Sequence, residues 1–276
     1  SRNMFALGLV CWLFNRPVDK AVSFLEGKFQ KKPQLIAPNV KVLTDGFNYG
    51  NNLALNIQTM NVEKSDQLPK GTYTSIAGNK ATAWGLIAAA EKCGKRLFLG
   101  SYPITPATDI MHELAARKDM GVMVVQAEDE IAGVCTAIGA AFAGDLAATS
   151  TSGPGLSLKS EAIGLAVMAE LPLVVIDVQR GGPSTGLPTK TEQTDLMQAL
   201  YGRNGEYPAV VMAASSSANC FEYAYQASKI ALENMTPVIL LTDTYLANGT
   251  GLWRIPQLKD LPEIQPQGVP EEFKGK

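Results

Sequence analysis

The chain has 276 residues, of which 46% are hydrophobic and 18% are charged, and its formal net charge is -2. These values are typical of a globular protein that is long enough to bury a sizeable core. A nearly neutral chain without clusters of Lys and Arg is not a dedicated nucleic-acid binder. No unbroken apolar run approaches the ~18 residues of a membrane span, so we expect neither nucleic acid nor a membrane as a partner.

The N-terminal residues 1–56 are predicted to be helical and then irregular. Met4–Phe14 is apolar and is predicted to form a buried helix, and Val18–Phe29 carries apolar residues at helical spacing. A polar segment from Asn61 to Thr74 follows, so residues 57–77 are expected to form a linker.

From residue 78 to residue 251, short apolar runs alternate with helical patterns, which predicts an α/β domain with a parallel sheet and helices on both faces. Ligands of such sheets bind beyond the carboxyl ends of the strands, so the segment after each strand is a candidate site. Residues 252–276 lack periodicity and are predicted to be a tail that leads into a following domain. The predicted strands are 96–101, 122–126, 146–150, 172–178, 209–212 and 238–242. The predicted helices are 80–93, 108–118, 130–143, 156–169, 193–200 and 218–233.

The four cysteines, Cys11, Cys93, Cys135 and Cys220, are spread along the chain without CxxC spacing. This pattern argues against a zinc site or an iron–sulfur cluster in this chain. Cys11 and Cys135 lie in apolar stretches and are predicted to be small core residues. Scattered cysteines suit a reducing compartment, so we expect a cytoplasmic protein.

The first predicted strand ends in a rigid turn that contains Tyr102, Pro103 and Thr105. Two prolines fix its backbone angles, and a hydroxyl held in this way can position a ligand. The alternative is a proline-rich turn whose threonine caps the next helix.

Three carboxylates, Glu128, Asp129 and Glu130, follow the second predicted strand. Acidic residues are favoured at the start of a helix by its dipole, and this interpretation suits Glu128 and Asp129 best. Glu130 is followed by Ile131 and other small apolar residues, and a carboxyl group in partly apolar surroundings can hold or pass a proton.

Two further segments follow buried strands. Thr149–Gly155 is rich in hydroxyls and glycines, which can present backbone N–H groups to a ligand. Gln179–Gln193 contains Arg180 and Lys190 among glycines and hydroxyls, and an arginine placed there can bind a carboxylate with two N–H groups. A mobile surface loop is the alternative. The single histidine, His112, lies inside a predicted helix, which argues against a His-dependent triad or a multi-histidine metal site.

Taken together, these segments resemble the alpha subunit of 2-oxoacid:ferredoxin oxidoreductases, especially the 2-oxoglutarate type. The resemblance implies a thiamine diphosphate-binding fold with a pyrimidine-type domain over residues 78–251. Residues 1–56 resemble the end of the gamma domain that many of these enzymes carry ahead of the alpha part, so we expect an internal fragment. The segments that carry the resemblance are Gly78-Asn79, Tyr102-Pro103-Ile104-Thr105-Pro106, Glu128-Asp129-Glu130, Ser152-Gly153-Pro154-Gly155 and Arg180-Gly181-Gly182-Pro183-Ser184-Thr185-Gly186.

The resemblance implies roles for the cofactor-side residues. Thr105, in the turn with Tyr102 and Pro103, matches a threonine near the cofactor and the substrate. Glu130 matches the glutamate that forms a hydrogen bond with N1′ of the aminopyrimidine of thiamine diphosphate, which makes it the predicted catalytic residue. Glu128 is the alternative, although alignment of the following helix without gaps favours Glu130.

The resemblance also implies a substrate and a reaction. Arg180 and Thr185 match the residues that hold the carboxylate of a 2-oxoacid. The implied reaction is oxidative decarboxylation of the 2-oxoacid, expected to be 2-oxoglutarate, to acyl-CoA and CO2 with reduction of ferredoxin. Relatives that act on pyruvate or branched-chain 2-oxoacids share the scaffold, so these substrates stay open.

One departure from the enzyme pattern implies a partner. Gly144-Asp145 is followed by Leu146, so the Gly-Asp-Gly motif that binds magnesium is absent. In the family a beta subunit supplies Mg²⁺ and a 4Fe–4S cluster, so this chain is expected to bind no metal, to be inactive alone and to work in a dimer of heteromers. A non-catalytic assembly or regulatory subunit of the same fold and an unrelated flavodoxin-like binding module are the alternatives.

Overall fold

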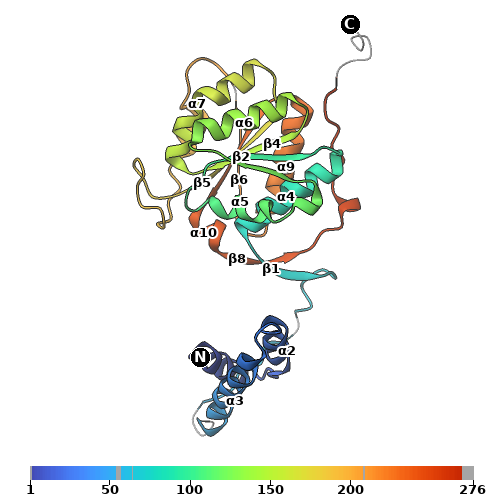
Figure 1. Cartoon of the computed structure of the whole chain (residues 1–276), viewed down its shortest axis with the longest axis vertical. Helices are drawn as coiled ribbons and strands as arrows, with labels where there is room; N and C mark the ends of the chain where they lie inside the picture. The colour runs from blue at the N-terminus through green and yellow to red at the C-terminus, as the bar shows by residue number, and fades with distance from the viewer. Residues whose placement is uncertain (1, 54–56, 64, 208, 269–276) are drawn as a thin grey trace. The chain divides into compact units, whose positions relative to one another are not determined.

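The computed structural model describes residues 2–53, 57–63, 65–207 and 209–268. The chain divides into two compact units, Ser1–Lys70 and Gly71–Lys276 (Figure 1). The division falls inside the polar segment that was expected to be a linker. No helix in the described ranges is long and apolar enough to cross a membrane.

The first unit is helical, and α1 packs against α3 through glycines. A Cβ atom on Gly8 would lie 1.9 Å from the carbonyl oxygen of Leu43, and one on Gly46 would lie 2.1 Å from that of Phe5. The missing side chains therefore let the two backbones touch. The helices of this unit are α1 (Arg2–Leu13), α2 (Asp19–Lys28) and α3 (Ile36–Leu53), with a 3-10 helix at Pro33–Leu35.

Two predictions for this unit are wrong. Only Gly8 and Trp12 of α1 are buried, so α1 is not the buried helix that its apolar residues predicted. Residues 36–53, expected to be irregular, form one long helix. Pro38 does not break it, because Pro38 lies in the first turn, where a missing N–H removes no helical hydrogen bond.

The second unit is built on a six-stranded sheet in which every neighbouring pair is parallel. This confirms the predicted fold class. The strand order is β3-β2-β4-β5-β7-β6, so the chain leaves β2 in one direction to β3 and returns to β4 on the other side. The topological switch point, where ligands of such sheets bind, therefore lies between β2 and β4. The strands are β2 (Leu97–Ser101), β3 (Met123–Gln126), β4 (Leu146–Thr151), β5 (Leu173–Gln179), β6 (Val210–Ala213) and β7 (Pro237–Asp243).

Helices cover both faces of this sheet. Val174 and Ile176 of β5 belong to one hydrophobic core, whereas Leu173 and Val175 belong to another, as the alternation of side chains along a strand requires. Figure 1 shows α6 and α7 on one side of the sheet and α4 and α5 on the other. The helices are α4 (Gly78–Cys93), α5 (Thr108–Ala115), α6 (Glu130–Phe142), α7 (Gly153–Met168), α8 (Leu196–Tyr201), α9 (Cys220–Asn234) and α10 (Thr244–Asn248), with 3-10 helices at Lys118–Met120 and Leu258–Asp260.

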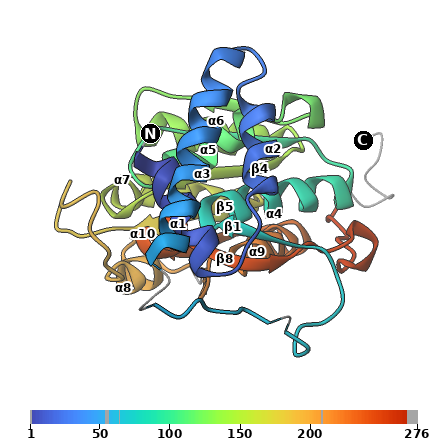
Figure 2. The same ribbon diagram turned by 90° about the horizontal axis from the view of Figure 1, so that it is seen from below.

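A second, two-stranded sheet was not predicted. β1 (Tyr73–Ala77) and β8 (Thr250–Arg254) pair antiparallel and lie side by side in Figure 2. Both strands are short and partly polar, so neither carries a strong strand pattern. The sheet is fixed to the domain where the ring of Trp253 packs on that of Phe221, with ring centres 5.1 Å apart.

Candidate functional site

Four of the predicted site segments meet at one edge of the parallel sheet. They follow β2, β3, β4 and β5, which are neighbours in the sheet. Because parallel strands point the same way, their carboxyl ends lie together. The edge therefore brings together the turn after β2, the starts of α6 and α7, and the loop after β5.

The turn after β2 is held from two sides. Nδ2 of Asn79, a buried residue of α4, donates a hydrogen bond of 2.8 Å to the Pro106 carbonyl oxygen. Nη1 of Arg180, which follows β5, donates one of 2.5 Å to the Thr105 carbonyl oxygen. The Thr105 side chain is exposed, and Tyr102 is half-buried. The turn thus presents its hydroxyl outward from a fixed backbone.

The three acidic residues at the start of α6 have different environments. Asp129 is the N-cap, and its carboxylate accepts a 2.7 Å hydrogen bond from the Ala132 backbone N–H. Glu128 is exposed, whereas Glu130 is half-buried in the first turn. A Cβ atom on Gly155 of α7 would lie 2.9 Å from Cγ of Glu130. Glu130 is therefore the acid that faces α7, in the space that this glycine leaves.

Lys159 was not predicted as a site residue. It is fully buried on α7, and its Nζ donates a 2.7 Å hydrogen bond to the backbone carbonyl oxygen of Glu130. Burial lowers the pKa of Lys159 to about 8, although the charges of Glu130 and Asp129 act in the opposite direction. Its position three and four residues from the apolar Leu156 and Ile163 was the available signal.

The loop after β5 is joined to the β2 turn by Arg180. This residue is 7% exposed, and its Nη2 donates a 2.7 Å hydrogen bond to the Thr185 carbonyl oxygen. Within the described ranges, Nε has no partner. A guanidinium has five N–H groups, so these two contacts leave three unused, of which the one on Nε is buried. The side chain of Thr185 is exposed, and the described contact uses its backbone.

Two carboxyl groups that were not predicted as site residues lie at the two ends of this loop, Asp177 before it and Asp195 as its last residue. Asp177 of β5 is fully buried, and no donor among the described residues reaches either of its oxygens or Oδ2 of Asp195. Burial raises the pKa of Asp177 well above its ordinary value, and the nearby Asp195 raises it further. Two carboxyl groups that face each other need one proton between them. Asp177, the more deeply buried of the two, is therefore the carboxyl group that we expect to carry this proton.

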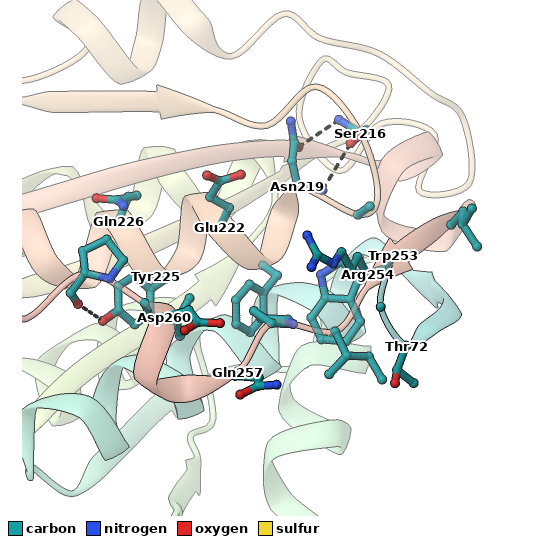
Figure 3. Close-up of a pocket in the computed structure, with 18 residues that line it drawn as sticks. Thr72, Ser216, Asn219, Glu222, Tyr225, Gln226, Trp253, Arg254, Gln257 and Asp260 are labelled. Atoms are coloured by element: carbon teal, nitrogen blue, oxygen red, sulfur yellow. Dashed lines mark hydrogen bonds between the residues drawn. The ribbon is translucent and has the colours of Figure 1, made fainter. Parts of the chain in front are cut away.

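A groove on the second unit is separate from this edge. It has a volume of about 830 Å³ and is lined by α9, β8 and the segment 255–262 (Figure 3). Figure 3 shows Trp253 and Arg254 together at one end of it and Glu222 and Asp260 further along. No residue of the segments that follow β2, β3, β4 or β5 lines this groove.

The residues that could bind a metal do not cluster in the described part of this chain. Across the described ranges, no group of three His, Cys, Asp or Glu residues could hold a metal ion. Asp145, in the sequence Gly-Asp-Leu, pairs with Arg96 at 2.7 Å between Oδ2 and Nη2. All four cysteines are free, and Cys135 is exposed on α6, so its predicted place in the core is wrong.

The comparisons with known proteins agree with this arrangement. Residues 89–276 match the family model described as pyruvate flavodoxin/ferredoxin oxidoreductase, thiamine diphosphate-binding. The chain belongs to this family, which confirms the resemblance stated above.

Two relatives and one solved structure define the similarity further. The chain is 54% identical over 265 residues to the 2-oxoglutarate oxidoreductase subunit KorA of Mycobacterium tuberculosis, covering 96% of this chain and 40% of the relative. It is 42% identical over 200 residues to the 2-oxoglutarate synthase subunit KorA of Methanothermobacter marburgensis, covering 72% of this chain and 52% of the relative. The 2-oxoglutarate:ferredoxin oxidoreductase from Magnetococcus marinus with 2-oxoglutarate, coenzyme A and succinyl-CoA bound matches with a TM-score of 0.87 at 37% identity, over 98% of this chain and 46% of that chain. The chain thus spans about half, or less, of the proteins it matches.

Proposed function

We propose that this chain supplies the aminopyrimidine side of a thiamine diphosphate site in a 2-oxoacid:ferredoxin oxidoreductase, with 2-oxoglutarate as the substrate. The observation that carries the proposal is the place of Glu130. It lies in the first turn of α6, beside the switch point of a sheet whose family binds thiamine diphosphate. The similar proteins named above, which act on 2-oxoglutarate by their names, support the choice of substrate.

The surroundings of Glu130 fit the cofactor. Within the described ranges, no hydrogen-bond donor reaches the Glu130 carboxylate, and Gly155 leaves space beside its Cγ atom. A half-buried carboxylate with free acceptor sites suits a ring nitrogen of an aminopyrimidine. When bound, thiamine diphosphate supplies the electron sink for decarboxylation of a 2-oxoacid. Glu130 would hold a proton for the N1′ atom of the cofactor, and Tyr102 and Pro103 of the β2 turn would line the same site.

The substrate side is assigned to the loop after β5 and the turn after β2. Arg180 neutralises and orients the carboxylate of the 2-oxoacid with the N–H groups that its backbone contacts leave unused. The hydroxyls of Thr105 and Thr185, both exposed, lie in segments that Arg180 joins. They provide hydrogen bonds to the same substrate.

The site needs a partner subunit. This chain carries neither the diphosphate-binding motif nor a metal-ligand cluster in its described part, so a beta subunit supplies Mg²⁺ and the 4Fe–4S cluster that passes electrons to ferredoxin. Apolar side chains near Glu130 and along α6 and α7 are exposed and suit such a partner. These are Ile131, Phe142, Leu158, Leu165 and Met168. The active form is a dimer of heteromers in the cytoplasm, where four unpaired cysteines are stable.

The test uses the assembled complex with thiamine diphosphate, Mg²⁺ and coenzyme A. Ferredoxin reduction is followed with 2-oxoglutarate, pyruvate and a branched-chain 2-oxoacid, and 2-oxoglutarate is expected to give the highest kcat/KM. Preference for one of the other substrates corrects the specificity. No turnover of any 2-oxoacid favours a non-catalytic subunit instead.

The role of Glu130 is tested by a pair of matched variants. Glu130→Gln removes the proton-carrying group and is expected to lower kcat by about 100-fold or more, the size of a general acid–base contribution. Glu128→Gln makes the same chemical change on an exposed neighbour and should leave kcat within about two-fold of the parent value, because exposed side chains away from a site contribute little. Equal effects of the two variants would remove Glu130 from its assigned role.

A further inference from the structure

Lys159 is a charged side chain inside the second unit. It is fully buried, and its neighbours at helical spacing on α7, Leu156 and Ile163, belong to the hydrophobic core under that helix. Lysine is almost never fully buried unless it has a partner, because its ammonium group loses its hydration. Its position therefore needs an explanation.

Two contacts from α7 meet at one residue of α6. Lys159 Nζ lies 2.7 Å from the backbone oxygen of Glu130. Gly155 lies four residues earlier on α7 and has no side chain. A Cβ atom on this residue would lie only 2.9 Å from Cγ of Glu130, so the glycine leaves room for the Glu130 side chain. Residues four apart lie on the same face of a helix. One face of α7 thus contacts both the backbone and the side chain of Glu130.

We propose that Lys159 is a positioning residue for Glu130, which fixes the first turn of α6 and faces the Glu130 carboxylate with a buried positive charge. The carboxylate is then oriented before a ligand arrives. The inference rests on the proposed function only for the identity of that ligand, the aminopyrimidine of thiamine diphosphate.

A role in folding alone does not explain a lysine here. The Glu130 carbonyl lies in the first turn of an α-helix, where such an oxygen accepts the N–H of the residue four positions on, so it needs no second donor. A cation near the start of a helix is also opposed by the helix dipole. Burial lowers the pKa of Lys159 despite the two nearby carboxylates, which means that the fold holds the ammonium less favourably than water does. Methionine would fill the same space without this penalty.

The experiment compares Lys159→Met with Ile163→Met in the assembled complex. Both place methionine at a buried position of α7, but only the first removes the charge. Three quantities are measured: hydrogen exchange at the amides of residues 131–134, the affinity for thiamine diphosphate, and Tm. The kcat and the KM for the 2-oxoacid are measured beside them.

Lys159→Met is expected to leave Tm unchanged or higher, because a buried charge is replaced by an apolar group. It should speed exchange at residues 131–134 and weaken thiamine diphosphate binding, each by about ten-fold, the change that loss of one charge-assisted hydrogen bond produces. The kcat should fall while the KM for the 2-oxoacid stays the same, since Arg180 is untouched. Ile163→Met should change none of these quantities.

Unchanged exchange at residues 131–134, or unchanged affinity for thiamine diphosphate, in Lys159→Met would overturn the proposal. If this variant does not fold, Lys159→Gln, which keeps a donor but no charge, gives the same comparison. Hydrogen exchange at α6 does not depend on turnover, so it tests Lys159 even if Glu130→Gln retains activity and the proposed function fails.

Discussion

The two sides of the candidate site are built in different ways. On one side, α6 and α7 begin almost directly after β3 and β4, and Glu130 is placed by the packing of two helices against a hydrophobic core. On the other side, residues 180–195 form a long loop between β5 and α8. Polar contacts hold this loop, among them Gly182 N–H to Glu192 Oε2 at 2.8 Å and the Asp195 N–H to Gln179 Oε1 at 3.0 Å.

Each side nevertheless contains one buried cation with the same kind of partner. Lys159 and Arg180 are both almost inaccessible, and the hydrogen bonds that the structure describes for them go to backbone carbonyl oxygens. Neither charge is neutralised by direct contact with a described carboxylate. Because packing places Glu130, the helix side should respond to changes of shape as well as to loss of the Lys159 hydrogen bond, whereas the loop side should respond mainly to changes of hydrogen bonding.

On the loop side, the largest effect is expected at Arg180. Arg180→Ala removes the hydrogen bonds to the Thr105 and Thr185 carbonyl oxygens and the group assigned to the substrate carboxylate. A hydrogen bond to a charged group contributes about 1.5–3 kcal/mol, so the KM for the 2-oxoacid should rise by about 10- to 150-fold. Steady-state kinetics on the complex measures this change.

Arg180→Lys is the control for charge. Lysine keeps the positive charge but cannot form the planar, forked hydrogen bonds of a guanidinium, so an intermediate rise of KM is expected. A KM that is unchanged in both variants would mean that Arg180 only ties the two loops together.

The helix side should respond to the addition of one methyl group. Gly155→Ala places a Cβ atom 1.9 Å from Thr151 Oγ1 and 2.9 Å from Glu130 Cγ, so Glu130 must move. Overpacking of this kind costs about 1–3 kcal/mol of unfolding free energy. We expect kcat to fall by about ten-fold, since a displacement of catalytic groups by about 1 Å costs up to 100-fold.

Gly164→Ala is the matched control on the same helix. The nearest atom to its added Cβ belongs to Tyr207, at 3.8 Å, so the methyl group fits. Because alanine is a better helix former, this variant should gain up to about 1 kcal/mol and keep its kcat. Equal losses in both variants would show that α7 tolerates no methyl group, rather than that Gly155 serves Glu130.

The same contrast explains what could be predicted from the sequence. The parallel sheet and the segments at its carboxyl edge were predictable, because β-type apolar runs alternate with helical ones and each motif follows its strand. The choice of Glu130 among three acids rested on resemblance, and the N-cap role of Asp129 agrees with the helix-dipole argument. The strands β1 and β8 were missed because they pair with each other although they are far apart in the sequence. No local sequence pattern reveals such a pairing.

Lys159 and Asp177 could not be assigned from the sequence for a related reason. A lysine in a helix or an aspartate in a strand is normally read as solvent-facing, and only the three-dimensional packing shows that both are fully buried. Asp177 was visible as one polar residue in an apolar strand, whereas Lys159 lies beside Ser157, Ser160 and Glu161 in its helix. A polar residue at such a position can be buried, but the sequence does not show which residues surround it.

The carboxyl pair of Asp177 and Asp195 should make stability depend on pH. Burial raises the pKa of Asp177 in the folded state, so the folded protein keeps a proton that the unfolded chain releases above about pH 4. The stabilisation is complete below the unfolded pKa and is lost as pH rises toward the folded pKa, by about 1.4 kcal/mol per pH unit.

Asp177→Asn should remove this dependence, because its amide donates to Asp195 without a titrating proton. Global hydrogen exchange of the β5 amides at pH 5, 6 and 7 measures the unfolding free energy of this unit. Between pH 5 and pH 7, the unfolding free energy of the parent protein should fall relative to that of Asp177→Asn. Parallel pH curves for the two proteins would show that Asp177 and Asp195 share no proton.

The smallest effect is expected at Gly139, on the exposed face of α6. A Cβ atom there would have no other atom within 4 Å, so Gly139→Ala should only raise helix propensity and stabilise the unit by up to about 1 kcal/mol. If Glu130 is positioned by the contacts that α6 makes with α7, added rigidity on the opposite face should leave kcat and KM unchanged. A lower kcat in this variant would mean instead that flexibility of α6 as a whole, rather than its contact with α7, sets the position of the acid. Thermal unfolding and steady-state kinetics on the same preparation separate these two outcomes.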